Sequence, residues 1–204
     1  MPRSGYTRMF REGIMSEFIF FDIGYTLVNE DAVWQIRFAE QAATPQAIAN
    51  GWTADLFYDA VCDACRSCLP HYRTVAERFR LEPTVPYRAE YESLYPEVPA
   101  LLQYLSGKYA LGIIANQSTG LTKRLDAFGI RQYFSVIASS WEAGMMKPDV
   151  RFFRYALSLA GITPSEALMI GDRLDNDIAP AKSIGMHTIR IRQGFGRLQT
   201  PRSK

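Results

Sequence analysis

Five short apolar runs, each ending in polar residues, constrain the fold of this chain more than any other feature. They are EFIFFD (17–22), ALGIIAN (110–116), YFSVIAS (133–139), EALMIGD (166–172) and HTIRIR (187–192). Runs of this length are typical of buried β-strands. Segments with helical periodicity separate the later four, at residues 119–130, 149–162 and 175–186. This alternation predicts an α/β fold, a doubly wound, Rossmann-like parallel sheet with right-handed crossovers.

The first two runs are separated by a much longer stretch, from Val28 to Pro96, which holds helix-like segments such as VWQIRFAEQAA and RTVAERFRL. We therefore predict a helical insertion at residues 29–95, set into an α/β core formed by residues 15–28 and 96–204. Residues 1–14 are basic and lack a long apolar run, unlike a secretory signal or a membrane helix. We expect them to form a disordered extension, with Met15 as a candidate for the true start.

Charge and size narrow the class of partner. With 204 residues and 48% hydrophobic composition, the chain can bury a full core. The net charge is only +2, and basic residues are scattered between acidic ones, so we expect neither nucleic acid nor a membrane as partner. A small molecule is the expected partner, while the sequence does not indicate an oligomeric state. The final FGRLQTPRSK is predicted to be a basic, mobile tail.

Three cysteines, in CDACRSCLPH, have a spacing that resembles part of an iron–sulfur ligand run, with His71 as a possible fourth ligand. The surrounding ADLFYDAVCDACRSCL has helical periodicity, however. Along a helix, residues 62 to 71 would spread over roughly 13–14 Å, too far to share one metal. We therefore interpret Cys62, Cys65 and Cys68 as helix-face residues, with a metal or redox role as the alternative. No disulfide framework follows, which fits a cytoplasmic location.

Polar residues follow several of the predicted strands. Asp22, Asn116 and Asp172 each end one strand, and Lys147 follows the third. Ligands of open parallel sheets bind where the carboxyl ends of strands meet, so we expect these side chains to converge. The acidic GDRLDND segment beside Asp22 suits a hard divalent cation such as magnesium. Magnesium and a lysine around one aspartate form a constellation for phosphoryl transfer. Within that segment, we expect Asp175 to be a solvated turn carboxylate.

The segments FFDIGYTLV, the turn after IIAN, GMMKPD and IGDRLDND, in this order, resemble the four motifs of the haloacid dehalogenase-like (HAD) hydrolase superfamily. The resemblance runs from about Glu17 to Gln193. It implies that residues 29–95 are a helical cap that closes over the site and sets substrate choice. It also implies Mg²⁺ as cofactor and a small phosphorylated compound as substrate.

Carried over position by position, the resemblance gives each site residue a role. Asp22 would be the nucleophile, forming an aspartyl-phosphate, and also a metal ligand. Gly24 would ligate the metal through its carbonyl, Asp172 would be the other protein ligand, and Asp177 would support the metal shell. Lys147 would bridge the nucleophile and the phosphate. Asn116 and the preceding Ala115 match positions at the phosphate-binding turn.

Three positions depart from the family pattern. Family phosphatases carry a second Asp two residues after the nucleophile as general acid and base, and here that position is Gly24. Loss of a positioned acid or base costs typically a factor of about 10²–10⁴ in rate, most heavily for alkyl phosphates. A phosphate-binding Ser or Thr is replaced by Ala115, for which Ser118 or Thr119 are possible substitutes. Tyr25 stands where a glycine is usual.

Three hypotheses follow from these departures. The first is a magnesium-dependent phosphatase whose acid comes from the cap or is not needed. Glu30, Asp31, His71 and Tyr25 are the candidates for that acid, and no spacing selects one. The alternative is a catalytically impaired binding or regulatory protein that keeps the fold. The third is a haloacid dehalogenase, whose halide leaves without protonation but which needs no magnesium.

Overall fold

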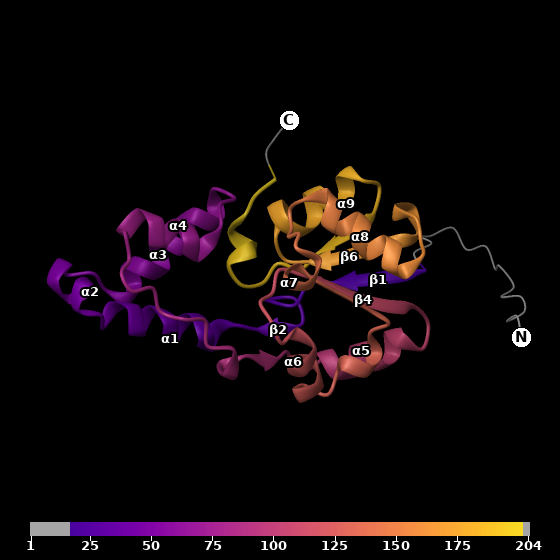
Figure 1. The fold of residues 1–204 in the computed structure, drawn as a ribbon, viewed down its shortest axis with the longest axis horizontal. Coiled ribbons are helices and arrows are strands. Elements are labelled where there is room, and N and C mark those ends of the chain that lie inside the picture. Colours follow the sequence, from indigo (N-terminus) through magenta and orange to yellow (C-terminus); the bar gives the residue numbers. More distant parts are fainter. Residues whose placement is uncertain (1–16, 202–204) are drawn as a thin grey trace, which may run out of the picture.

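A five-stranded parallel sheet forms the centre of the protein, in a computed structural model that describes residues 17–201 (Figure 1). The expectation about residues 1–14 lies outside the described residues. The sheet has the order β5-β4-β1-β6-β7, and every neighbouring pair is parallel. Its strands are β1 (Phe18–Phe21), β4 (Ala110–Ala115), β5 (Val136–Ser139), β6 (Ala167–Gly171) and β7 (His187–Arg190). Their near-continuous apolar sequences suit strands covered on both faces.

Helices cover both faces of this sheet, which confirms the predicted doubly wound fold (Figure 1). One face carries α5 (Val98–Ser106) and α6 (Leu121–Ala127). The other carries α8 (Val150–Ala160) and α9 (Ala179–Ser183), while the short α7 (Ser140–Ala143) follows β5 directly. Alternate residues of β1 point to opposite faces, so Ile19 and Phe21 belong to one apolar cluster and Phe18 and Phe20 to the other.

Four helices and a short antiparallel ribbon lie between β1 and α5. The helices are α1 (Asp31–Ala42), α2 (Pro45–Asn50), α3 (Ala54–Arg66) and α4 (His71–Phe79). They pack around their own apolar cluster, which includes Trp34, Phe57 and Val61, and they project to one side of the sheet (Figure 1). The ribbon pairs β2 (Val28–Asn29) with β3 (Ser93–Leu94) and so joins the two ends of the insertion. Two-residue strands leave no readable sequence pattern, so the ribbon was not predicted.

Short helical turns complete the chain: η1 (Ala89–Tyr91), η2 (Arg131–Tyr133), η3 (Pro164–Glu166), the π-helical η4 (Leu174–Ile178) and η5 (Phe195–Leu198). The predicted helix at residues 175–186 is thus divided into η4 and α9, with Pro180 in the first turn of α9. No helix within residues 17–201 has the length and apolar character that crossing a membrane requires.

The helix predicted around the cysteines contains the first two of them and ends before the third. Cys62 and Cys65 are buried on α3, whereas Cys68 follows its end in a left-handed conformation with φ of 56°. Burial raises the pKa of the Cys65 thiol to about 12, so this thiol stays protonated. Among the described residues, the cysteines form no group of three potential metal ligands.

The prediction of a mobile tail at FGRLQTPRSK is wrong for its described part. Phe195 is buried and packs against Trp34 of α1, with ring centroids 5.2 Å apart. Arg190 donates hydrogen bonds to the carbonyls of Gly196 and Gln199 at 2.6 and 2.7 Å. This C-terminal segment therefore contacts both the sheet, through Arg190, and the inserted helices, through the ring of Phe195.

Candidate active site

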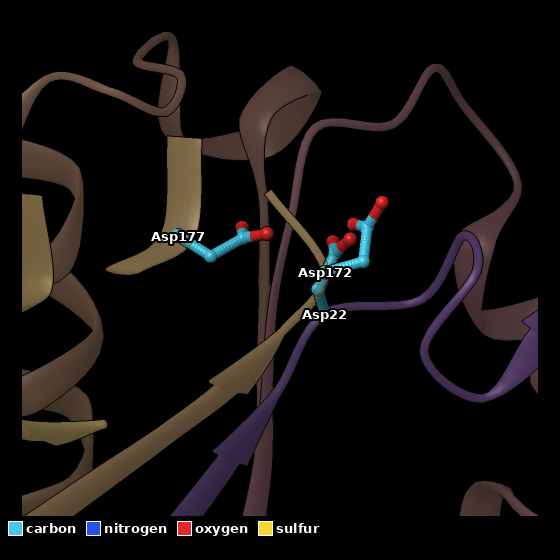
Figure 2. A group of neighbouring side chains, drawn as sticks. All are labelled: Asp22, Asp172 and Asp177. Carbon is cyan, nitrogen blue, oxygen red and sulfur yellow. The ribbon is translucent and has the colours of Figure 1, made fainter. Parts of the chain in front are cut away.

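Three aspartates converge at the carboxyl edge of the sheet. Asp22 directly follows β1 and Asp172 directly follows β6, and these two strands are neighbours in register. The backbone N–H of Asp22 donates to the carbonyl of Ile170 at 2.9 Å, which extends the pairing to the site. The carboxylate of Asp177 points toward the other two from η4 (Figure 2). One carboxylate oxygen from each aspartate lies within 4.8 Å of the others.

Asp177 reaches this cluster because the chain turns back tightly after β6. The backbone N–H of Arg173 donates to Oδ2 of Asp177 at 3.0 Å. A Cβ atom at Gly171 would lie only 2.5 Å from Cγ of Asp177. Glycine at the end of β6 is therefore what allows the Asp177 side chain to pack against the strand.

Lys147 lies between two of these carboxylates. Its Nζ is 2.6 Å from Oδ1 of Asp22 and 2.6 Å from Oδ1 of Asp177, and the residue is only 3% exposed. Burial alone would lower the pKa of the ammonium, but the charges of Asp177 and Asp22 outweigh burial and raise this pKa. Burial and the charges of Asp177 and Asp22 also raise the pKa of Asp172 well above its usual value. Three carboxylates around one ammonium leave negative charge that a cation would balance.

Asn116 holds the backbone that carries this lysine. Its Nδ2 donates to the carbonyl of Lys147 at 2.8 Å, and its Oδ1 accepts from the N–H of Lys147 at 2.7 Å. The preceding Ala115 ends β4 with its side chain fully buried. Ser118 and Thr119, the possible substitutes for a missing hydroxyl, are exposed, and neither lines the cavity around Asp22 among the described residues.

A cavity next to the three aspartates lies between the carboxyl edge of the sheet and the inserted helices. Asp22 and Asp172 line it from the ends of β1 and β6, and Lys147 from the loop before α8. Glu30 and His71 line it from the insertion. Burial and the positive charge of Arg173 lower the pKa of His71 to about 3, so its imidazole is neutral at pH 7.

Glu30 is the carboxylate of the insertion that faces this cavity. Its Oε2 accepts a hydrogen bond from the indole N–H of Trp34 at 3.1 Å. Burial raises the pKa of the Glu30 carboxyl to about 7, although the bond from Trp34 opposes the rise. Sequence spacing does not distinguish Glu30 from the other candidates for the general acid, because the turn after β1 is what brings Glu30 to this cavity.

The prediction for Asp175 as a solvated turn carboxylate is wrong. Its side chain is only 19% exposed and forms an ion pair with Arg173. It also accepts a hydrogen bond from Nε2 of Gln199 at 2.7 Å. Burial alone would raise the pKa of Asp175, but these bonds lower it. Gln199 lies in the predicted tail, so no sequence pattern indicates this partner.

Tyr25 has a backbone conformation that glycine normally adopts. Its φ is 53°, in the left-handed region that favours glycine. Its ring packs edge-on against Phe195, with centroids 5.8 Å apart. The aromatic replacement therefore serves the contact with the C-terminal segment.

Comparison with known proteins assigns the sequence of this chain to one family. Residues 19–191 match the family model described as haloacid dehalogenase-like hydrolase. A glyceraldehyde 3-phosphate phosphatase of Methanocaldococcus jannaschii is 37% identical over 105 residues, which cover 49% of this chain and 45% of that protein. This match therefore spans less than half of the relative's length. Pyrimidine 5'-nucleotidase YjjG of Escherichia coli is 29% identical over 190 residues, 84% of each chain.

Solved structures give the same result for the fold. A crystal structure of a HAD phosphatase from Thermococcus onnurineus superposes with a TM-score of 0.66. The superposition covers 86% of both chains at 24% sequence identity. At this identity the likeness concerns the fold alone.

Proposed function

The chain belongs to the haloacid dehalogenase-like hydrolase family, and on that premise we propose that it is a magnesium-dependent phosphatase. Its substrate is a small phosphorylated compound, and its intermediate an aspartyl-phosphate on Asp22. The observation that carries the proposal is the position of Lys147, whose ammonium lies 2.6 Å from the Asp22 carboxylate within a buried acidic cluster. A binding site for an uncharged ligand would not require so many buried charged groups, because burying charge costs free energy.

In this mechanism Asp22 is the nucleophile. Its carboxylate oxygen attacks phosphorus as the bond from phosphorus to the leaving oxygen breaks. A water molecule then attacks the phosphorus of the aspartyl-phosphate, which releases inorganic phosphate and restores the carboxylate. Lys147 holds Asp22 in place and offsets the negative charge of the phosphoryl oxygens.

The acidic cluster fits a magnesium ion. Asp22 and Asp172 would hold it with the carbonyl of Gly24, and Asp177 would support them. Carboxylate and carbonyl oxygens are the donors that magnesium prefers, and these carboxylates carry more negative charge than Lys147 balances. When bound, magnesium neutralises phosphate oxygens and makes phosphorus easier to attack.

The relatives support a small phosphorylated substrate. The names glyceraldehyde 3-phosphate phosphatase and pyrimidine 5'-nucleotidase both describe the removal of phosphate from a small molecule. Helices α1 to α4 act as the cap in this proposal, because Glu30 and His71 bring that part of the chain to the cavity above Asp22. Residues 29–95 would then select the part of the substrate beyond the phosphate.

Turnover of an aryl, an acyl and an alkyl phosphate, measured with magnesium and with EDTA, tests this function. We expect release of inorganic phosphate that requires magnesium, is abolished by Asp22→Asn and is unaffected by Asp126→Asn, the same change at an exposed position on α6. Intact-protein mass spectrometry after an acid quench should show one added phosphoryl group, absent in Asp22→Asn.

A second candidate is phosphate binding without turnover. The buried methyl group of Ala115, at a position where the family has a phosphate-binding hydroxyl, favours it. If no ester is hydrolysed above the Asp22→Asn background while calorimetry detects binding of inorganic phosphate, this second function replaces the first.

A further inference from the structure

The carboxylate of Glu30 fills the space into which a side chain at position 24 would extend. A Cβ atom built on Gly24 would lie 2.3 Å from Oε1 of Glu30, 2.9 Å from its Cδ and 3.3 Å from its Oε2. These are the three nearest atoms, so Glu30 is the group that such a side chain meets first. The backbone at Gly24 is outside the left-handed region, so its conformation would accept another residue. Position 24 is therefore closed by Glu30 and not by the backbone.

The turn after β1 brings the two residues together. The N–H of Tyr25 donates to the carbonyl of Val28 at 2.7 Å, and the N–H of Val28 donates to the carbonyl of Ile23 at 3.0 Å. The chain thus reverses and enters β2, which is fixed by its pairing with β3. Glu30 follows β2 immediately and lies beside Gly24, although six positions separate them in the sequence.

Glu30 is also held in one orientation toward the site. The indole of Trp34, one helical turn further along α1, fixes Oε2 at 3.1 Å. Trp34 itself is buried among Phe38, Phe195 and His71. A carboxylate fixed by a rigid neighbour is prepared for proton transfer, because little reorganisation is needed when the substrate binds.

The other candidates for the general acid are less well placed than Glu30 to act beside Gly24. Asp31 lines a neighbouring cavity beside Phe38 and Phe195, away from Asp22. Tyr25 also lines the cavity around Asp22, but its ring packs against Phe195 and its hydroxyl interacts with Asp31. His71 lines the same cavity as Glu30, but it begins α4 and does not occupy the space beside Gly24.

We propose that Glu30 is the general acid and base of this site, in place of the side chain that Gly24 lacks. Glu30 donates a proton to the leaving oxygen as its bond to phosphorus breaks. The resulting carboxylate then takes a proton from the water that attacks the aspartyl-phosphate, which returns Glu30 to its starting form. This assignment rests on the proposed phosphatase function, and it makes alkyl phosphates, whose oxygen leaves poorly without a proton, accessible substrates.

Leaving-group dependence tests the assignment. Glu30→Gln keeps the shape of the side chain and an oxygen for Trp34, but it cannot transfer the proton. We expect kcat/KM for an alkyl phosphate to fall about 10²–10⁴-fold, while an aryl phosphate, whose leaving group needs no proton, loses less than about tenfold in the first step. Asp31→Asn, the same kind of change one position further along, should leave the ratio of aryl to alkyl turnover unchanged.

A swap of the two positions gives a second, independent test. In Glu30→Ala the space beside position 24 is empty, so adding Gly24→Asp should restore alkyl turnover at least tenfold over Glu30→Ala alone. Gly24→Asp with Glu30 still present should not gain activity, since the two side chains compete for the same space.

The possible failures are distinguishable. If the wild type hydrolyses no phosphate ester, the proposed function fails. If the wild type hydrolyses aryl but not alkyl esters, or if Glu30→Gln keeps alkyl turnover within threefold of the wild type, phosphatase function stands and the role of Glu30 is overturned. A loss in Glu30→Gln that is equal for both esters would also overturn it, because a merely structural effect does not depend on the leaving group.

Discussion

The side-chain amide of Asn116 forms two hydrogen bonds with the backbone of Lys147. Its Nδ2 donates to the carbonyl at 2.8 Å, and its Oδ1 accepts from the N–H at 2.7 Å. The lysine in turn contacts Asp22 and Asp177. Asn116 therefore links the end of β4 to the loop between α7 and α8 and determines where the ammonium lies. Its sequence position matches a phosphate-binding turn, but in this arrangement its amide groups position Lys147.

Asn116→Ala should lower kcat more than it raises KM. Without the amide, the N–H and carbonyl of Lys147 lose their partners, and a shift of the ammonium by about 1 Å can cost on the order of 10²-fold in rate. We also expect unfolding to become easier by about 1–3 kcal/mol. Steady-state kinetics and urea unfolding check both effects, with Ser118→Ala in the same turn as control. A large rise in KM with unchanged kcat would instead indicate that Asn116 binds the phosphate.

Lys147→Met should destabilise the protein strongly in EDTA. The change leaves buried carboxylates without their cation, and breaking a buried ion pair in this way costs about 3–5 kcal/mol. Urea unfolding measures the loss, and Lys182→Met, the same change at an exposed position of α9, is the control. A loss below about 1 kcal/mol would mean that the carboxylates are not held by this lysine.

Magnesium should raise the melting temperature, and Asp172→Asn should remove most of that rise. A ligand at a hundred times its Kd stabilises the folded state by about 2.7 kcal/mol, so scanning calorimetry over a magnesium series reports binding without any need for activity. Asp175→Asn is the matched control, because Asp175 lies three residues further along the chain but is paired with Arg173 and Gln199. An undiminished rise in Asp172→Asn would place the metal elsewhere.

The sequence was sufficient to predict the edge of the sheet at which the candidate site forms. Strands are short and strongly apolar, and their carboxyl ends meet by topology, so the meeting of Asp22 and Asp172 follows from the order of the elements alone. The match of the chain to one family confirms the resemblance that those strand ends carried. Such local signals do not depend on how distant segments pack.

Contacts between distant or irregular segments could not be predicted. The closeness of Glu30 to Gly24 depends on a turn and a two-residue ribbon that have no periodicity. The burial of Asp175 could not be predicted, because one of its two partners, Gln199, is 24 residues away in a segment whose basic composition suggests mobility. Composition cannot reveal that one buried ring, Phe195, anchors such a segment.

Phe195→Ala tests that anchor. The ring is buried against Trp34, Phe38 and Tyr25, so its removal should cost about 3–5 kcal/mol in unfolding free energy. Leu159→Ala, which truncates an exposed apolar residue on α8, should cost much less. Chemical unfolding of both variants decides the matter, and equal losses would show that the C-terminal segment contributes nothing specific.

Stability should fall in mild acid through His71. Burial first, and then the charge of Arg173, lower the pKa of its imidazole to about 3 in the folded protein, against about 6.5 when unfolded. Asp175 opposes this effect, and the rings of Trp34 and Phe195 complete the surroundings. Below pH 6.5 the imidazole of His71 binds a proton in the unfolded chain, whereas in the folded protein it stays neutral until the pH approaches 3. The stabilisation is therefore complete above that pH and is lost as pH falls toward 3.

The expected loss from this histidine between pH 6.5 and pH 5 is about 2 kcal/mol, since each pH unit below the unfolded pKa contributes about 1.4 kcal/mol. Urea unfolding at several pH values should show that His71→Leu flattens the decline relative to the wild type. Slopes and not absolute stabilities are compared, because the substitution also changes packing. His187→Leu, the same change at the other histidine of the chain, measures the effect of losing an imidazole elsewhere. A wild-type slope in His71→Leu would assign the acid sensitivity to other groups.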